Sequence, residues 1–204
     1  GAGGRGWAVP WLTGWHVTTE VISIVSPNER DSLFIQYFNH TPFAERLMDE
    51  AEVNWGGEST IQSAIQELKS RGAENAKIGV IGALPFGSYE VLKAFTGEII
   101  NLNAAYTKLR LVKSEEELEW YRIGAALSDL AIDALLTKMR TGLTEHDLAA
   151  IVESSYVPWG GKTGIHFFGV TAMEKPHLYV PAQFTSNRVV TAGDIVFTEI
   201  TASF

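Results

Sequence analysis

The sequence predicts an α/β protein of two parts. Short apolar runs alternate with amphipathic segments up to about residue 102, which is typical of α/β domains. This pattern changes around residues 101–112, where basic side chains interrupt the apolar runs before a long helical segment begins. At 204 residues with 46% hydrophobic content, the chain is long enough to bury two ordinary cores.

The first part is expected to contain five strands and three helices. The strand candidates are Ala8–Leu12, Val21–Val25, Leu33–Phe38, Lys77–Ile81 and Glu98–Leu102, and the helical candidates are Pro42–Glu52, Ser59–Arg71 and Tyr89–Phe95. In the second helix, Ile61, Ile65 and Leu68 recur at intervals of four and three residues. They therefore share one helical face, and we expect that face to pack on a sheet.

The second part begins with two helix-start signals. Ser114 is followed three residues later by Glu117, and Thr144 by Asp147, so each hydroxyl can cap a helix. The first helix should run to about Met139 along an apolar or small stripe, listed in chain order as Leu118, Tyr121, Ala125, Ser128, Ala131 and Leu135. Strands are expected at Ile165–Thr171 and Ile195–Ile200, with a Pro-bearing loop at Lys175–Asn187 between them.

The last strand contains one carboxylate, Glu199, within a run of β-branched and aromatic residues. Such a run predicts a buried strand. An unpaired ionised acid is costly to bury, so the usual partners are a cation, a hydrogen-bond network or a metal. Glu199 is therefore a candidate site residue.

Composition and missing motifs exclude several classes of function. A net charge of −8 without a Lys/Arg cluster argues against binding to nucleic acid or to an anionic membrane, and no apolar run is long enough to span a bilayer. The absence of cysteine excludes disulfides and thiolate chemistry, and favours a reducing, cytoplasmic location. Walker loops, Gly-x-Gly-x-x-Gly, Gly-x-Ser-x-Gly and His-Glu-x-x-His motifs do not occur.

Three ordered motifs carry a family resemblance. They are Arg110-x-x-Lys113-Ser114-x-x-Glu117, Gly142-Leu143-Thr144-Glu145 and Gly193-Asp194-Ile195-Val196-Phe197-Thr198-Glu199. In this order they resemble the pita-bread hydrolases, the family of methionine aminopeptidase, prolidase, aminopeptidase P and creatinase, and chiefly its two-domain branch. The resemblance implies a creatinase-type N-terminal α/β domain at residues 1–109 and the first half of an α+β pita-bread catalytic domain at residues 110–204. It also implies that both ends of the family fold are missing.

The resemblance gives Glu199 a specific position. In the peptidase members the equivalent residue is Asp, the first of five ligands around two metal ions, so a divalent metal (Mn, Co or Zn) is expected in a complete parent and none in this fragment. Glu is also an oxygen ligand, but its additional methylene displaces the oxygens. Three interpretations therefore stay open: a metal ligand, a hydrogen-bonded residue of a metal-free pocket, and a structural acid.

Other candidate residues have a functional and a structural interpretation. By resemblance, His177 lies near a histidine that faces the substrate, and the alternative is a solvent-facing loop histidine. His166, on an apolar strand, is expected to be a hydrogen-bonded core residue. Trp7, Trp11 and Trp15 are expected to pack in a core or at an interface.

The expected function follows from the resemblance. The leading hypothesis is a fragment of a metal-dependent Xaa-Pro aminopeptidase or prolidase-like hydrolase, inactive as given because most of the metal ligands would lie beyond Phe204. One alternative is a creatinase-like hydrolase, metal-free or with an altered metal site, that acts on a small non-peptide C–N substrate. Another is a non-catalytic, self-associating domain. We expect a homodimer or higher oligomer, a peptide or small-molecule substrate in the parent, and neither nucleic acid nor membrane as partner.

Overall fold

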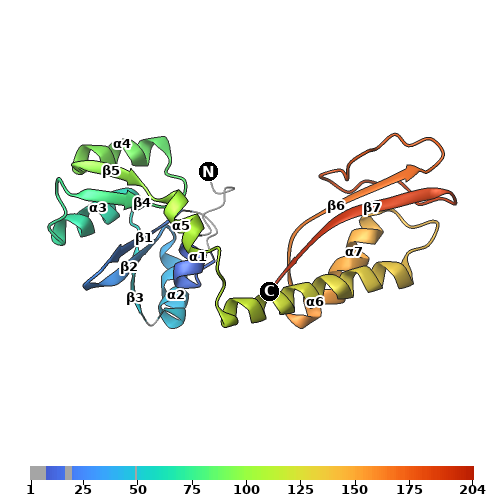
Figure 1. Ribbon diagram of the computed structural model, residues 1–204, viewed down its shortest axis with the longest axis horizontal. Coiled ribbons are helices and arrows are strands. Elements are labelled where there is room, and N and C mark those ends of the chain that lie inside the picture. Colours follow the sequence, from blue (N-terminus) through green and yellow to red (C-terminus); the bar gives the residue numbers. More distant parts are fainter. Residues whose placement is uncertain (1–7, 17–19, 49) are drawn as a thin grey trace. The chain divides into compact units, whose positions relative to one another are not determined.

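The computed structural model describes residues 8–16, 20–48 and 50–204. The chain forms two compact units, Gly1–Leu111 (unit 1) and Val112–Phe204 (unit 2). Each unit builds its own sheets and its own core (Figure 1). In the described part of the chain, no helix is both long enough and apolar enough to cross a membrane.

Unit 1 is built around a three-stranded sheet. Strands β1 (Val21–Ser26) and β2 (Glu29–Ile35) form an antiparallel hairpin, and β3 (Ala51–Trp55) pairs with β2 in parallel. The other elements are α1 (Ala8–Thr13), η1 (Phe38–His40), α2 (Thr41–Leu47), α3 (Thr60–Ser70), α4 (Phe86–Phe95) and α5 (Asn103–Leu109), with a parallel pair of strands, β4 (Lys77–Val80) and β5 (Glu98–Asn101).

Both faces of the three-stranded sheet are covered by helices. Successive side chains of β2 point to opposite faces, so each face contributes its own residues to a core cluster. Leu33 and Ile35 pack with Ala44 and Met48, from α2 and the residue after it, in one core cluster. Phe34 packs with Ile24 of β1 and Ala64 of α3 in another. The sheet therefore lies between helices on its two faces, as a three-layer α/β arrangement requires.

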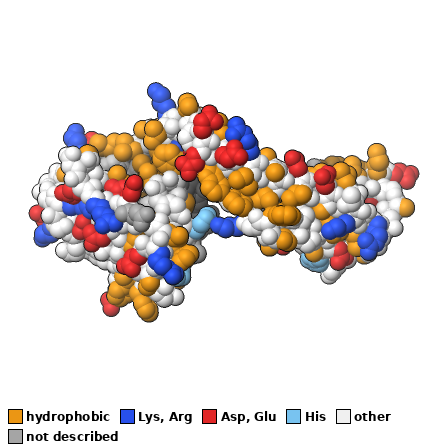
Figure 2. Space-filling view, turned by 90° about the horizontal axis from the view of Figure 1, so that it is seen from below, with side chains coloured by type: hydrophobic (Ala, Val, Ile, Leu, Met, Phe, Trp, Pro, Cys, Tyr) orange, Lys and Arg blue, Asp and Glu red, His pale blue; other side chains and the backbone are white. Residues whose placement is uncertain are grey.

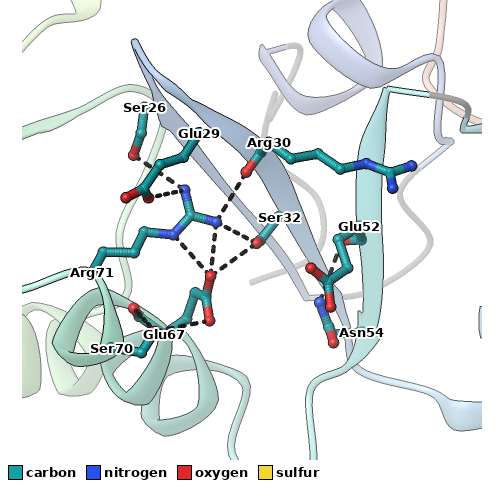
Figure 3. A network of polar contacts seen from close by, with 9 residues as sticks. All are labelled: Ser26, Glu29, Arg30, Ser32, Glu52, Asn54, Glu67, Ser70 and Arg71. Carbon is teal, nitrogen blue, oxygen red and sulfur yellow. Dashed lines mark hydrogen bonds and ion pairs between the residues drawn. The ribbon is translucent and has the colours of Figure 1, made fainter.

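A buried arginine ties α3 to the β1–β2 hairpin. The Arg71 side chain is 10% exposed, and its Nη2 lies 2.7 Å from Glu67 Oε1. The guanidinium also donates to Ser26 Oγ, Ser32 Oγ and the Arg30 carbonyl, and forms an ion pair with Glu29 (Figure 3). The hydrogen bond from Arg71 is the main reason that the pKa of Glu67 is lowered. The network locks the C-terminal end of α3 to the hairpin.

Unit 2 has two layers, with helices α6 (Glu115–Lys138) and α7 (Glu145–Tyr156) on one face of an antiparallel pair of strands. The strands are β6 (Lys162–Ala172) and β7 (Asp194–Ser203), and a short helix, η2 (Val157–Trp159), follows α7 (Figure 1). Leu127 and Leu135 of α6, Leu148 and Val152 of α7, and Phe168 of β6 meet in its core. The predicted capping boxes at Ser114 and Thr144 are both confirmed.

Several predicted elements of unit 1 were wrong. Ala8–Leu12 is not a strand but lies in α1, where Pro10 occupies the first turn, a place that tolerates its missing N–H. The predicted helix Pro42–Glu52 ends at Leu47 in α2, and its last residues enter β3. Helix α5 was not predicted.

The tryptophans near the N-terminus have different environments. Trp15 is buried with the α2 side of the sheet, and Trp11 packs edge-on against Tyr106 with Arg110 over its ring. Both therefore pack within unit 1. Trp7 lies outside the described residues.

Candidate functional site

The open face of the β6–β7 sheet carries the predicted site residue Glu199. Val196, Ile200 and Ala202 pack against the core of unit 2, so the alternating residues of β7 point to the face away from α6 and α7. Glu199 belongs to this second set, opposite Phe167 of β6, and it is exposed. The prediction of a buried carboxylate was therefore wrong. The strand is buried on one face only, and Glu199 stands on the other.

A shallow groove of about 270 Å³ lies along the same face, toward the start of β7. Its lining is mostly apolar and comes from β6, β7 and the loop between them: Thr171, Met173, Pro176, Leu178, Tyr179, Ile195 and Phe197. Glu199 is four residues beyond Ile195, about 13 Å along the strand at the usual rise per residue. The carboxylate therefore lies beyond the apolar part of this face.

A glycine shapes the floor of this face. Gly169 of β6 pairs with Phe197 of β7, and a Cβ added at Gly169 would lie 2.4 Å from the Phe197 ring. The tip of the aromatic ring can therefore lie against residue 169 only because this residue has no side chain. This contact keeps Phe197 folded over the sheet, where it lines the groove.

His177 is held beside the groove by Thr171. The backbone N–H of His177 donates to Thr171 Oγ1, and His177 Nδ1 lies 2.9 Å from the same oxygen. The hydroxyl has one proton and two lone pairs, so it can accept the backbone N–H and also either donate to Nδ1 or accept from it, depending on the ring tautomer. Thr171 is 1% exposed, whereas the His177 side chain is exposed. The arrangement presents an oriented imidazole ring to solvent.

The loop that carries His177 is anchored by the buried Glu145, which is 2% exposed. One carboxylate oxygen accepts the N–H of Val170 at 3.1 Å, and the other accepts the N–H and Oγ–H of Ser186 at 2.9 and 2.7 Å. Glu145 thus joins α7, β6 and the loop. In the sequence, Glu145 is visible only as part of a helix-start motif, and its position in the first turn gives no sign of burial.

An ion pair between Arg188 and Asp194 holds the end of this loop at the start of β7. Arg188 Nη2 donates to both carboxylate oxygens of Asp194, each at 2.8 Å. Asp194 also accepts the N–H and Oγ–H of Thr191. The hydrogen bond from the Thr191 N–H, assisted by the charge of Arg188, lowers the pKa of Asp194 below its ordinary value.

His166 faces the core rather than the groove, as expected. It is 8% exposed, its Nδ1 accepts the Thr201 N–H, and its Nε2 lies 2.6 Å from the Tyr156 hydroxyl. Nε2–H therefore donates to Tyr156, whose own proton is available to Thr163 Oγ1 at 2.7 Å. Burial raises the pKa of Tyr156. This chain of hydrogen bonds satisfies the polar groups of the core.

The described residues do not fit a two-metal centre. No group of three or more His, Cys, Asp or Glu side chains that could hold a metal ion occurs within them. Glu199 offers a single exposed carboxylate. A metal ion would need further ligands from elsewhere.

Comparison with known proteins identifies the fold. No family model matches the chain. It is 24% identical over 190 residues to an uncharacterized peptidase of Bacillus subtilis, YqhT, and this match covers 92% of the chain and 52% of that protein. The chain thus spans about half the length of this relative.

Solved structures give the same result. The prolidase of Pyrococcus horikoshii superposes with a TM-score of 0.77 at 18% identity, over 97% of this chain and 55% of that one. The X-Pro aminopeptidase of Thermotoga maritima gives 0.75 at 20% identity, with 97% and 55% covered. The Xaa-Pro dipeptidase of Bacillus anthracis gives 0.71 at 19% identity, with 95% and 53% covered. The resemblance predicted from the three motifs is confirmed, and the chain has the fold of about half of a prolidase or Xaa-Pro aminopeptidase.

Proposed function

We propose that this chain is part of an Xaa-Pro peptidase-like hydrolase. Unit 1 would be the N-terminal α/β domain, and unit 2 part of the pita-bread catalytic domain. The observation that carries the proposal is the open β6–β7 face, where the groove, His177 and Glu199 occur together in a fold shared with prolidases. The substrate would be a peptide with an apolar or prolyl residue.

The residues of this face suggest how a peptide would be held. The apolar groove can accept a prolyl ring or another compact apolar side chain. Beside it, Nε2 of His177, in the tautomer that carries the proton there, can donate to a carbonyl oxygen of the same peptide. The contact with Thr171 Oγ1 limits the rotation of the ring. In this proposal His177 binds and orients the peptide.

Binding of an Xaa-Pro dipeptide to the chain tests this role. Ala-Pro titrated into isotope-labelled protein should shift the NMR signals of His177, Ile195 and Phe197, and His177→Ala should weaken binding by about tenfold, the cost of one hydrogen bond. The matched control is His146→Ala, because His146 is also exposed and its Nδ1 also contacts a threonine hydroxyl, at 2.8 Å. Equal loss of binding in both variants, or shifts away from the groove, would count against the proposal.

Glu199 favours a second candidate, a creatinase-like hydrolase of a small C–N compound without the usual metal centre. Its support is that Glu replaces the expected Asp and that this exposed carboxylate belongs to no group of three or more potential ligands among the described residues. Titration with Mn²⁺ tests for metal binding at this position, because bound Mn²⁺ broadens nearby NMR signals. Broadening centred on Glu199 that Glu199→Gln abolishes supports the peptidase. Absence of broadening is expected of this chain under both candidates, because no group of three potential ligands occurs among the described residues.

We also propose that this chain does not hydrolyse Xaa-Pro peptides by itself, since a metal ion would lack a set of three ligands among the described residues. Hydrolysis of Ala-Pro in the presence of Mn²⁺, Co²⁺ or Zn²⁺ would overturn this part of the proposal. We further expect the chain to form a homodimer or a higher oligomer.

A further inference from the structure

A bulge interrupts the pairing of β6 and β7 close to the end of β7. Thr163 pairs with Ala202, and His166 pairs with Ile200. Two residues of β6 therefore lie opposite a single residue of β7, Thr201. A bulge disrupts the ladder of backbone hydrogen bonds locally, so the strand needs other contacts to hold it there. In this bulge a side chain supplies one.

The His166 ring accepts a hydrogen bond from the backbone of Thr201. Thr201 N lies 3.3 Å from His166 Nδ1, and the Tyr156 hydroxyl lies 2.6 Å from Nε2 on the other side of the ring. Because a backbone N–H can only donate, Nδ1 is the unprotonated nitrogen of a neutral ring, and Nε2 carries the proton. His166 is 8% exposed. The contact with Thr201 therefore requires one tautomer of a buried, neutral imidazole.

We propose that His166 is a positioning residue that holds the end of β7 in place as long as its ring is neutral. Uptake of a proton would add an N–H at Nδ1, which would then point at the Thr201 N–H, and two donors cannot bond to each other. A buried ring N–H without an acceptor is costly, so acid should separate Thr201 from the ring. The end of β7 is thus coupled to pH through one histidine.

The surroundings of His166 differ from those of the exposed ionisable groups. Unit 2 carries charged side chains of both signs on its surface (Figure 2), where water and salt screen them. The His166 ring instead faces Tyr156 of α7, and Glu153 on the same helix acts on that hydroxyl through its charge. From β7 the ring meets Thr201, and α6 contributes the apolar Leu127 to this core. Protonation of the ring would therefore alter a buried contact rather than a screened surface charge.

The contact matters for the candidate site because Glu199 lies on the same strand, two residues before Thr201. That separation is about 7 Å at the usual rise per residue. The position of the Glu199 carboxylate on the open face depends on how the end of β7 is held against β6, so release of Thr201 should allow Glu199 to move. This consequence rests on the function proposed above, whereas the contact between His166 and Thr201 does not.

NMR spectroscopy of the intact chain tests the contact without any ligand. At about pH 7.5, Nδ1 of His166 should give the signal of an unprotonated ring nitrogen, and Nε2 that of a protonated one. As the pH is lowered to about 5, the Thr201 amide signal should shift with the same midpoint as the His166 ring signals. Its protection from exchange, corrected for the intrinsic pH dependence, should fall about five- to tenfold, the worth of one hydrogen bond. A proton on Nδ1 at the higher pH, or a Thr201 amide that is unaffected by acid, would overturn the proposal.

Two substitutions separate the acid effect from a general loss of packing. His166→Asn places an amide oxygen near the position of Nδ1 and cannot take up a proton, so the Thr201 amide should stay protected at both pH values. His166→Phe keeps a ring but offers no acceptor, so that amide should be about five- to tenfold less protected at both. The matched control, His146→Asn, removes an exposed histidine that also contacts a threonine hydroxyl, and should leave the acid effect on Thr201 unchanged.

The outcomes distinguish this proposal from the proposed function. If acid releases Thr201 in His166→Asn as readily as in the unsubstituted chain, His166 does not hold the strand and the proposal is refuted. If the contact behaves as expected but the chain does not bind Ala-Pro, only the proposed function is refuted.

Discussion

Replacing Glu145 by Gln tests whether one buried carboxylate holds the loop that presents His177. Glutamine has nearly the same shape but only one acceptor oxygen, and its NH₂ group must face either Val170 N–H or Ser186 N–H. In the less costly orientation, the glutamine oxygen keeps the two hydrogen bonds from Ser186. The glutamine NH₂ group then faces the Val170 N–H, so that two donors meet and neither has an acceptor. The change is therefore conservative in volume and disruptive in hydrogen bonding.

The magnitude follows from the three hydrogen bonds. A buried N–H left without an acceptor costs about 1–3 kcal/mol, and the two bonds that remain lose their charge assistance, about 0.5–1 kcal/mol each. The expected destabilisation of this part of unit 2 is about 2–5 kcal/mol. At 1.4 kcal/mol per tenfold, that corresponds to roughly 30- to 4,000-fold faster exchange of the Val170 amide proton.

Amide hydrogen exchange by NMR is a suitable assay because it reports on each unit separately, whereas global unfolding of two units need not be two-state. The Leu33 amide in unit 1 serves as an internal control and should keep its protection. Glu116→Gln, a substitution of an exposed acid in the first turn of α6, should change stability by at most about 0.5 kcal/mol. If the Val170 amide of Glu145→Gln exchanges within threefold of the unsubstituted rate, the anchoring role of Glu145 is refuted.

Three further predictions concern packing and charge. Gly169→Ala should destabilise unit 2 by about 1–3 kcal/mol, because the added methyl group meets the Phe197 ring. In the double variant, Phe197→Leu should relieve part of that cost. Amide exchange in β6 measures both effects. Arg71→Met should destabilise unit 1 by about 1–3 kcal/mol in amide exchange, because hydrogen bonds are lost while Glu67 and Glu29 keep contact with solvent. Lys77→Met, which breaks an exposed ion pair, should cost less than about 1 kcal/mol, and equal effects would contradict the network. Because folding lowers the pKa of Asp194, its stabilisation is present at neutral pH and is lost as pH falls from the ordinary value of 3.8 through the lower folded value. The stability difference between the unsubstituted chain and Asp194→Asn should therefore shrink as pH is lowered from neutral into this acidic range, and a difference independent of pH would contradict this.

The sequence predicted unit 2 better than unit 1, for physical reasons. The capping boxes at Ser114 and Thr144 are local signals, complete within four residues, and both helices start where the signals place them. In unit 1 the apolar run at residues 8–12 fits a strand or a helix equally well, and only its packing on the sheet decides for α1. The burial of Glu145 depends on Ser186, 41 residues away, so no local pattern could reveal it.

The same distinction explains why Glu199 was placed on the right strand but in the wrong environment. The run from Ile195 to Ile200 predicts a strand from composition alone, and β7 contains it. Whether a strand residue is buried depends on what covers each face of the sheet, and in unit 2 helices cover only the face of Val196 and Ile200. The open face therefore carries Phe197 and Glu199 outward, with Phe197 and the anchored His177 at the groove and Glu199 beyond it. A carboxylate in that position needs no buried partner to be stable. The fold of unit 2 therefore does not require an acid there, and the roles proposed for Glu199 depend on what binds to this face.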